Sequence, residues 1–341
     1  MKVLLYFENE KMTEVSGIGR ARRHQMMALE SAGIEYTTNP LDDYDILHIN
    51  TYFLNSNAII MKARREGKPV IYHAHSTEED FRNSYVFSNL VSPVFKKYLV
   101  SLYGLADEII TPTTYSKKLL ENYGLKQRIT AISNGIDLER FEYDEDKVKA
   151  FRRYFSLKSE DKVILGVGLL FNRKGLIDFF EVAKALPEYK FIWFGDTPLV
   201  SVPKEIKDAI EERPMNVMMP GYVKGPIIEG AYLSSNCFFF PSYEETEGIV
   251  VLEALASKQQ VIVRDIGAFD PWLVDKVNCY KGHNNEEFID IIKKTINGEL
   301  PSTRLEGYQV AKERSIDAIG LQLKEVYERV YANREKNQKG I

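Results

Sequence analysis

Cysteine, histidine and tryptophan are scarce in this chain of 341 residues, which contains two, five and two of them, respectively. Cys237 and Cys279 lie in apolar or strand-like surroundings and lack the spacing of metal ligands. A disulfide framework and a zinc-binding cysteine cluster are therefore not expected. Both thiols are predicted to be buried in a protein of a reducing compartment.

Long hydrophobic runs are also absent. No stretch approaches the roughly 20 apolar residues of a membrane-spanning helix, and the apolar run within Met1–Phe7 is too short for a signal peptide. Any membrane is therefore expected to be touched from one side only. The net charge of −4 gives no general attraction to nucleic acid or anionic lipid, so no nucleic-acid partner is expected and lipid attraction requires a local basic patch.

The chain does contain a regular alternation of strand-like and helical segments. Its length exceeds what one hydrophobic core usually fills, and 44% hydrophobic with 28% charged residues is ordinary globular composition. This alternation is typical of parallel sheets covered by helices, so we predict an α/β fold with two Rossmann-like halves and a cleft. The expected strands are Val3–Phe7, Ile46–Ile49, Val70–His75, Glu108–Thr113, Val163–Val167, Phe191–Phe194, Val217–Met219, Cys237–Phe240 and Val261–Arg264.

Charged residues mark the best candidate for a domain boundary. Glu142–Lys162 is rich in Asp, Glu, Lys and Arg, and it is expected to carry a helix as well as a linker. From Asn284 onward the chain is predicted to be helical. An apolar stripe near its end comprises Ile316, Ile319, Leu323, Val326, Tyr327 and Val330.

A strand–loop–helix turn is the most informative feature. The run Cys237–Phe240 predicts a buried strand, and apolar residues at helical spacing after Gly248 predict a helix that begins there. The N-terminus of such a helix, at Gly248, Ile249 and Val250, offers unpaired N–H groups that favour an anionic ligand such as a diphosphate.

Two carboxylates flank this predicted phosphate site, Glu245 in the loop and Glu253 in the helix. Carboxylates repel phosphate, so these two are better suited to accept hydrogen bonds from sugar or ribose hydroxyls. The pattern favours a nucleotide-sugar pocket. The competing interpretation is a surface helix with ordinary solvated acids.

The same residues carry a resemblance to a known family. Glu245 and Glu253 are separated by seven residues, with Gly248 between them and Ala254 directly after Glu253. This arrangement resembles the E-x7-E signature of the retaining GT-B glycosyltransferases of family 4. The segment Glu-Thr-Glu-Gly-Ile-Val-Val-Leu-Glu is similar to that of Gram-positive membrane glycolipid synthases, above all those adding a second sugar to glucosyl-diacylglycerol. The resemblance implies that Glu245 contacts donor-sugar hydroxyls and that Glu253 contacts the nucleotide ribose.

The resemblance also implies an architecture. A GT-B fold would place two Rossmann-like domains across a cleft. Residues 1–145 with 318–341 would form the acceptor and membrane-facing domain, including a last helix that crosses back, and residues 146–317 would bind the donor nucleotide sugar.

The implied activity is that of a metal-independent, retaining hexosyltransferase without a cofactor. Its partners would be UDP-glucose or UDP-galactose, a glycolipid acceptor and an anionic membrane surface. It would be cytoplasmic and peripheral on the inner face of the cell membrane. The two donors differ at one hydroxyl, so the choice between them stays open.

The glycine-rich turn Ser16–Arg20 follows the first expected strand, where a doubly wound domain usually places a ligand-facing loop. It lacks the third glycine of a dinucleotide fingerprint, because Arg22 stands there. In the resembled family this loop lies between acceptor and donor diphosphate, so Gly17 and Gly19 are candidate backbone contacts. The alternative is a tight turn needed only for packing.

His73 and His75 lie two apart at the end of an expected strand and share one of its faces. A metal pair or a single functional imidazole could result, although no third ligand is evident. The resemblance implies that His75 approaches the donor sugar and that His73 is structural. Without the resemblance, both could equally be buried structural histidines.

Phosphate-directed cations are expected just past the strand Val163–Val167. A departing nucleoside diphosphate accumulates charge that Arg or Lys can stabilise, and Arg173 and Lys174 stand there. Lys174 matches the family lysine. The family arginine position holds Leu169 instead, so Arg173 would replace that arginine only imperfectly, and a solvated surface pair is the alternative.

Two further residues resemble family positions near the nucleotide. They are Gly195, at the end of an expected strand, and Tyr222, and either could instead be an ordinary turn residue.

The segment Phe81–Ala106 has no acidic residue yet is rich in apolar and aromatic residues. It either docks on a membrane or packs as a core helix, and Pro93 is expected to break any continuous helix there. Its candidate membrane or acceptor contacts are Arg82, Phe95, Lys96, Lys97 and Tyr98.

The mechanism implied by the resemblance is front-side transfer of a hexosyl group with retention of the α-configuration. Arg173, Lys174 and the helix end near Gly248 would stabilise the leaving diphosphate. Two alternatives remain at this point: a glycosyltransferase of capsular or cell-wall polysaccharide or of diacylglycerol itself, and a nucleotide-sugar-binding module without turnover.

Overall fold

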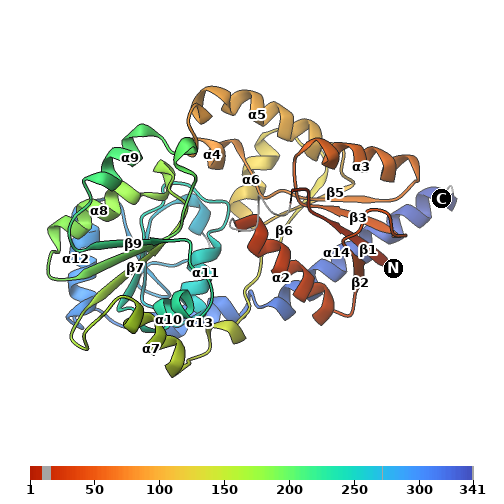
Figure 1. The fold of residues 1–341 in the computed structure, drawn as a ribbon. Coiled ribbons are helices and arrows are strands. Elements are labelled where there is room, and N and C mark those ends of the chain that lie inside the picture. Colours follow the sequence, from red (N-terminus) through yellow and green to blue (C-terminus); the bar gives the residue numbers. More distant parts are fainter. Residues whose placement is uncertain (10–16, 271, 340–341) are drawn as a thin grey trace. The chain divides into compact units, whose positions relative to one another are not determined.

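The computed structural model describes residues 1–9, 17–270 and 272–339 (Figure 1). The chain forms two compact units. The first comprises residues 1–79, 90–135 and 314 onward, and the second comprises residues 80–89 and 136–313. The expected domain limits were 145 and 318, whereas the first unit ends at residue 135 and resumes at 314, and the short segment 80–89 belongs to the second unit. The division into independently folding domains stays a prediction.

The first unit is built on a parallel six-stranded sheet of order β2-β1-β3-β4-β5-β6. Its buried, mostly apolar strands explain why helices cover both faces. The strands are β1 (Lys2–Tyr6), β2 (Glu35–Thr37), β3 (Ile46–Ile49), β4 (Val70–His73), β5 (Glu108–Thr111) and β6 (Arg128–Ala131).

Helices pack against both faces of this sheet, and each face forms a separate apolar cluster with the helices that cover it. One face is covered by α3, α5 and α6, and the other by α2 and α14. The helices are α2 (Gly17–Ser31), α3 (Leu54–Arg65), α4 (Glu78–Phe81), α5 (Ser88–Tyr103), α6 (Thr114–Asn122) and α14 (Ile316–Lys339).

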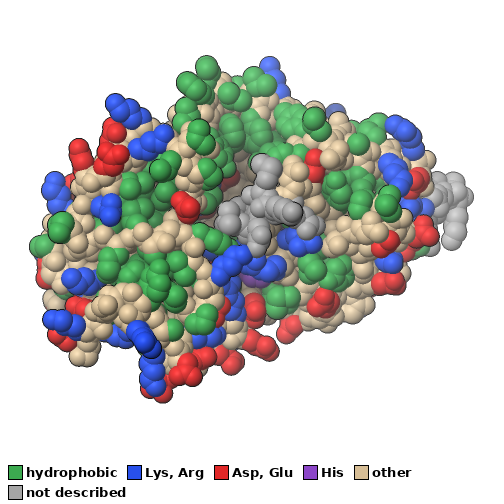
Figure 2. Space-filling model, in the orientation of Figure 1, with side chains coloured by type: hydrophobic (Ala, Val, Ile, Leu, Met, Phe, Trp, Pro, Cys, Tyr) green, Lys and Arg blue, Asp and Glu red, His purple; other side chains and the backbone are tan. Residues whose placement is uncertain are grey.

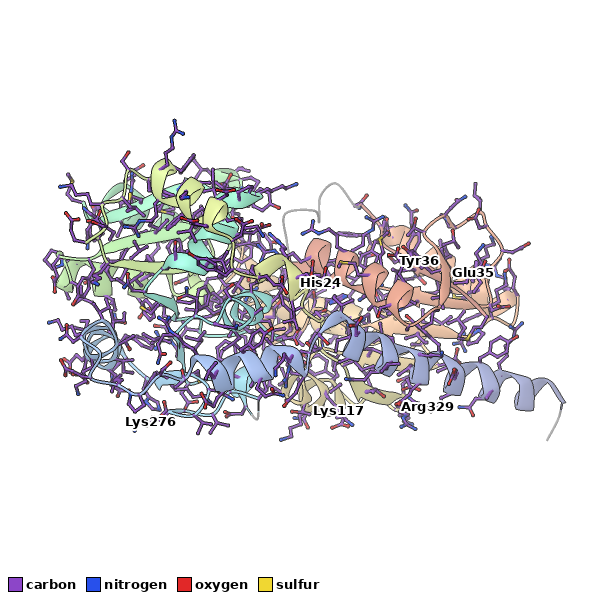
Figure 3. All side chains as sticks on the ribbon, turned by 90° about the horizontal axis from the view of Figure 1, so that it is seen from below. His24, Glu35, Tyr36, Lys117, Lys276 and Arg329 are labelled. Carbon is purple, nitrogen blue, oxygen red and sulfur yellow. The ribbon has the colours of Figure 1, made fainter. Side chains whose placement is uncertain are left out.

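The last helix, α14, packs its apolar stripe into the core of the first unit, beside α2. All six residues of the stripe expected from the sequence are buried. Arg329, labelled in Figure 3, also donates from α14 to both oxygens of the buried Glu108 in β5, at 3.1 and 2.5 Å. A bidentate ion pair of this kind fixes the orientation of α14 against the sheet, in addition to the apolar contact.

The second unit repeats the plan with a parallel sheet of order β12-β11-β10-β7-β8-β9. The helices α7, α10, α11 and α13 share one apolar cluster, and α8, α9 and α12 share the other. The strands are β7 (Val163–Val167), β8 (Lys190–Phe194), β9 (Val217–Gly221), β10 (Cys237–Phe240), β11 (Val261–Arg264) and β12 (Tyr280–Gly282). The helices are α7 (Glu145–Tyr154), α8 (Leu176–Ala185), α9 (Lys204–Glu211), α10 (Pro226–Ser234), α11 (Ile249–Ala256), α12 (Asn285–Ile296) and α13 (Arg304–Lys312), with short 3₁₀ turns η1 (Glu139–Phe141), η2 (Asn172–Lys174), η3 (Leu199–Ser201) and η4 (Gly267–Phe269).

The two-sheet α/β architecture confirms the predicted fold class, and both cysteines are buried and free as expected. The expected break at Pro93 is wrong, because α5 continues through it. Pro93 lies near the start of α5, where a missing N–H costs one helix hydrogen bond. The break falls earlier, at residues 82–87, where Asn83 and Phe87 have positive φ values of 53° and 65°.

Candidate functional site

Strand order alone marks where the second unit should bind a ligand. The sheet reverses its winding between β7 and β10, which are neighbours, and ligands of doubly wound sheets bind outside the carboxyl ends of strands at such a point. The segment after β7 carries Arg173 and Lys174, and the segment after β10 carries Glu245. The topology therefore brings Arg173 and Lys174 close to Glu245, which lies 71 positions after Lys174 in the sequence.

Lys174 and Glu245 form the centre of this site. The Lys174 ammonium donates to Glu245 Oε1 in a very short contact, and Ser242 Oγ donates to the same oxygen at 2.8 Å. Burial alone would raise the pKa of Glu245, but Lys174 and Arg173 hold it below its usual value. Burial and the neighbouring Arg173 lower the pKa of Lys174, although Glu245 opposes them. The site thus holds a buried ion pair whose two members suit hydroxyl and phosphate groups.

The Arg173 side chain is bound by neighbours on several sides. Its guanidinium lies 2.9 Å from the Asp80 carboxylate, donates to Ser84 Oγ at 2.8 Å and to the Glu244 carbonyl at 2.9 Å. Only 8% of its surface is exposed. Arg173 therefore ties the segment 80–89 to the loop that carries Glu245. Its role as a diphosphate clamp stays a prediction.

Backbone geometry locks the two loops together. Gly175 adopts the left-handed conformation at φ 72°, and a Cβ atom there would lie 2.3 Å from the Pro241 carbonyl oxygen. The Tyr243 N–H donates to the Arg173 carbonyl at 2.7 Å, and Ser242 Oγ lies 3.1 Å from the same carbonyl oxygen. Glycine is required at 175 because both its φ value and the close approach exclude a side chain.

The helix α11 begins where the sequence predicted. Gly248 caps it in the left-handed conformation with φ 85°, and as a glycine it provides no capping side chain. The first turn, which starts at Ile249 and Val250, contains no acidic residue. Its N–H groups and positive dipole end therefore remain suited to an anion.

Glu253 lies inside α11 and is 1% exposed. The Tyr232 hydroxyl donates to its Oε2 at 2.8 Å, and Arg140 approaches its other oxygen at 3.9 Å while forming a 2.8 Å ion pair with Glu229. A buried carboxylate with these partners is held in one orientation.

Gly195 and Tyr222 follow neighbouring strands of the same unit. Gly195 has φ 138°, and a Cβ atom there would lie 1.9 Å from the Gly168 carbonyl oxygen, so its conformation and close packing require glycine. Its N–H donates to the Gly221 carbonyl at 2.9 Å. Tyr222 is half-buried, with Lys224 above its ring at 5.5 Å. Leu169, at the position of the family arginine, is half-buried as well.

In the first unit, His75 lies two residues after the end of β4, and its Nε2 lies 2.9 Å from Asn50 Oδ1. His73 is fully buried within β4, as befits a structural residue. Gly17 and Gly19 belong to the first turn of α2, whereas Ser16, which opens the expected turn, lies outside the described residues. His75 and both glycines therefore belong to the first unit, and Glu245 and Lys174 belong to the second.

The helix α5 turns several of its expected lipid contacts inward. Phe95 packs against the core of the first unit, Tyr98 donates to the Tyr52 carbonyl at 2.7 Å, and Lys96 pairs with Glu78 at 3.2 Å. Lys97 and Arg82 are exposed. The exposed apolar residues of α5 are instead Leu90, Val91 and Val94, with exposed fractions of 79%, 45% and 68%.

Figure 2 shows the hydrophobic side chains gathered over this part of the surface. Exposed apolar residues also precede α5 in the chain, at Tyr85, Val86 and Phe87. Within the described residues, no helix has the length and hydropathy needed to cross a bilayer. Residues 1–9, 17–270 and 272–339 also contain no group of three or more His, Cys, Asp or Glu side chains placed to hold a metal ion.

Several site residues could not be found from the sequence. Ser242 stands in the motif stretch but had no predicted role, and Asp80 and Ser84 are distant in sequence from the loops they contact. Asn50 contacts His75, and Gln25 donates to Asn50. Neither residue could be predicted from the sequence, because single amide side chains are common at polar positions.

Family comparisons cover most of the chain. Residues 21–140 match the model of Glycosyltransferase Family 4, and residues 148–314 match that of Glycosyl transferases group 1. A processive diacylglycerol alpha-glucosyltransferase of Acholeplasma laidlawii is 49% identical over 97% of this chain and 98% of its own length. An alpha-galactosylglucosyldiacylglycerol synthase of Streptococcus pneumoniae is 24% identical over 73% of this chain and 66% of its own.

Solved structures share the fold. Anabaena HepE in complex with UDP-glucose superposes with a TM-score of 0.77 at 17% identity, covering 96% of this chain and all of that one. Sucrose-phosphate synthase of Thermosynechococcus elongatus gives 0.81 at 16% identity over 98% of this chain and all of that one. Two parallel six-stranded sheets with these neighbours define the GT-B fold. The chain belongs to glycosyltransferase family 4 and is a retaining hexosyltransferase.

Proposed function

We propose that this chain transfers α-glucosyl groups from UDP-glucose to diacylglycerol and to the glucosyl-diacylglycerol that results, building a membrane glycolipid. One observation carries the proposal: the relative from Acholeplasma laidlawii, named a processive diacylglycerol alpha-glucosyltransferase, is 49% identical over nearly the whole of both chains. The galactosyl-adding relative is only 24% identical. Glucose is therefore the better-supported donor sugar.

The donor site of this proposal lies around Lys174 and Glu245. Lys174 and the N-terminus of α11 would stabilise the departing diphosphate, because both place positive charge where negative charge develops. Glu245, freed from Lys174 by the phosphate, would accept hydrogen bonds from sugar hydroxyls. Glu253 would accept from the ribose, with Tyr232 holding its other oxygen.

Retention would follow from attack on the face that the diphosphate leaves. Retaining glycosidases use two carboxyl groups about 5–5.5 Å apart across the sugar ring. Here the Glu245 carboxylate accepts from Ser242 and would also accept from sugar hydroxyls, which stabilises its charge and reduces its nucleophilicity. The leaving phosphate oxygen would then take the proton of the acceptor hydroxyl. His75 would contribute by contacting a hydroxyl of the donor sugar.

The acceptor is a lipid, so the proposal includes a membrane-facing surface. Leu90, Val91 and Val94 form the outer face of α5, and Lys97 follows them on the same helix. Apolar side chains of this kind enter the acyl boundary while a lysine meets anionic headgroups. The chain would therefore act as a peripheral protein on the cytoplasmic face of the membrane.

The test measures UDP release and lipid products with purified protein on phosphatidylglycerol-containing vesicles. UDP-glucose and UDP-galactose are each offered with diacylglycerol, glucosyl-diacylglycerol or a soluble disaccharide, with and without EDTA. We expect products carrying one and two glucoses from diacylglycerol, unchanged by EDTA. Use of UDP-galactose alone would overturn the donor assignment. Transfer only to the soluble sugar would move the chain to polysaccharide synthesis.

A further inference from the structure

A series of buried polar side chains leads to His75 within the first unit. Its members are Tyr327 of α14, His48 of β3, His73 of β4, Gln25 of α2 and Asn50, the residue after β3. Each of these five is at most 2% exposed. Buried polar groups are costly unless they are paired, so such a series is maintained by specific hydrogen bonds.

The amide of Gln25 sets the direction of these hydrogen bonds. Its Nε2 lies 2.9 Å from Asn50 Oδ1 and 2.9 Å from His73 Nδ1. An amide nitrogen only donates, so both partner atoms must accept. His75 Nε2 lies 2.9 Å from the same Asn50 oxygen, and this ring nitrogen must therefore be the one that carries a proton.

The remaining contacts involve His48. Its Nε2 lies 3.3 Å from His73 Nδ1, whose single lone pair already accepts from Gln25, and its Nδ1 lies 2.6 Å from the Tyr327 hydroxyl. His73 and His75 are thus assigned neutral forms with the proton on Nε2.

Ring stacking supports the neutral state. The rings of His73 and His75 are 4.2 Å apart between centroids and 6° from parallel, and those of His48 and His73 are 5.4 Å apart and 4° from parallel. Burial lowers the pKa of His75 to about 3, and burial together with His75 lowers the pKa of His48 to about 3. The titratable groups along this series are the three imidazoles and Tyr327. Two stacked imidazolium rings would repel each other, so neutral rings are the stable arrangement.

We infer that Asn50, oriented by Gln25, positions His75 with its Nε2 protonated so that Nδ1 offers a lone pair to a sugar hydroxyl. The role of Nδ1 toward the sugar rests on the proposed function, but the tautomer does not. Asn50 and Gln25 are positioning residues, because they act through His75. An amide at position 50 orients the ring without stabilising its protonated form, which a carboxylate would do.

The first test is the tautomer itself, measured by nitrogen NMR of the intact chain labelled with ¹⁵N-histidine. The chain has five histidines, and comparison with His75→Gln assigns the signal of His75. We expect neutral, Nε2-protonated His75 from pH 7.5 to 5.5, and a mixture of tautomers in Asn50→Leu. An Nδ1-protonated ring in the wild type, or an unchanged tautomer in Asn50→Leu, would overturn the inference.

The second test is the pH profile of glucosyl transfer. Asn50→Asp places a carboxylate beside His75 Nε2 and should raise the pKa of His75, so kcat should fall about tenfold for each pH unit below the new pKa. The wild type should change less than about twofold from pH 7.5 to 5.5. The matched control is Asn122→Asp, an exposed position of α6 that gains the same charge.

Gln25→Leu keeps the assay informative should Asn50 variants fold poorly. It removes the donor to Asn50 and should lower kcat about tenfold while leaving KM for UDP-glucose nearly unchanged. Identical pH profiles of the wild type and Asn50→Asp would contradict a positioning role. Absence of transfer by the wild type would refute the proposed function, and the NMR result would still decide the tautomer.

Discussion

Arg173 and Asp80 form an ion pair of 2.9 Å in the second unit, with 9% and 19% of their side-chain surfaces exposed. Arg173 also donates to Ser84, so the segment 80–89 is held to the loop between β7 and α8. Burial raises the pKa of Asp80, and Arg173 opposes that rise. The pair therefore has a structural role in addition to any contact with substrate.

Asp80→Asn should destabilise the second unit by about 3 kcal/mol, because it removes the carboxylate that lies closest to a buried guanidinium. For a unit of this size, that loss lowers the melting temperature by roughly 6–12 °C. Thermal unfolding followed by circular dichroism measures it. Glu145→Gln is the matched control, since Glu145 pairs with Lys149 on the exposed surface and its loss should be silent. Equal melting temperatures of the two variants would contradict the role of the pair.

Glu245→Gln should reduce kcat by about 10²–10³-fold while UDP still binds. The amide keeps the shape of the side chain but loses the charge that orients Lys174 and attracts sugar hydroxyl protons. UDP release and calorimetric titration with UDP separate the two effects. Glu211→Gln, an exposed change on α9, serves as the control. A variant that turns over normally would remove Glu245 from the site.

Tyr232→Phe tests the support of Glu253. The change deletes the hydroxyl that donates to Glu253 at 2.8 Å and leaves a buried carboxylate oxygen without that partner. We expect KM for UDP-glucose to rise about tenfold, with a smaller change in kcat, because the proposed ribose contact binds ground state and transition state alike. Initial rates at varied UDP-glucose give both constants. An effect confined to kcat would argue against ribose binding by Glu253.

His48 should make the first unit sensitive to acid. Burial and His75 lower the pKa of His48 to about 3 in the folded chain, against about 6.5 when unfolded. Between these values only the unfolded state binds the proton, so stability falls as the pH drops below about 6.5 toward 3. The expected loss is about 2 kcal/mol at pH 5.

Denaturant unfolding of the wild type and His48→Gln at pH 7 and pH 5 measures this dependence. The variant should lose less stability on acidification, because it cannot take up that proton. His283→Gln, at an exposed histidine, should behave like the wild type. An equal loss in all three proteins would exclude His48 as the source.

Leu90→Ser together with Val94→Ser should weaken binding to anionic vesicles about 30- to 700-fold, because each exposed apolar side chain contributes roughly 1–2 kcal/mol on burial. Vesicle flotation measures the bound fraction. Leu41→Ser is the control, since Leu41 is 86% exposed on the same unit but outside α5. Binding that survives the double change would place the membrane surface elsewhere.

The sequence predicted the interior strands because they are short runs of buried apolar residues. The expected bounds of Ile46–Ile49, Val163–Val167 and Cys237–Phe240 are confirmed. The strands Glu35–Thr37 and Tyr280–Gly282 were not predicted, because edge strands are short and partly polar.

The candidate site likewise contains residues that the sequence predicted and contacts that it could not predict. Glu245 and Glu253 could be predicted because their spacing fits a loop followed by a helix, which the structure confirms. The hydrogen bonds from Gln25 to Asn50 and from Arg173 to Ser84 could not, because the partners are 25 and 89 residues apart. Such pairings depend on strand order, which no local pattern of residues encodes.

The position of α14 has a consequence for synthesis on the ribosome. The core of the first unit is completed by residues 316–330, so its sheet cannot gain the cover of α14 until those residues have been made. The second unit, whose segments end at residue 313, is finished earlier. At about 5–20 residues per second, the nascent first sheet waits many seconds with α2 as the only helical cover on that face. During that interval it depends on chaperones or on partial packing by α2.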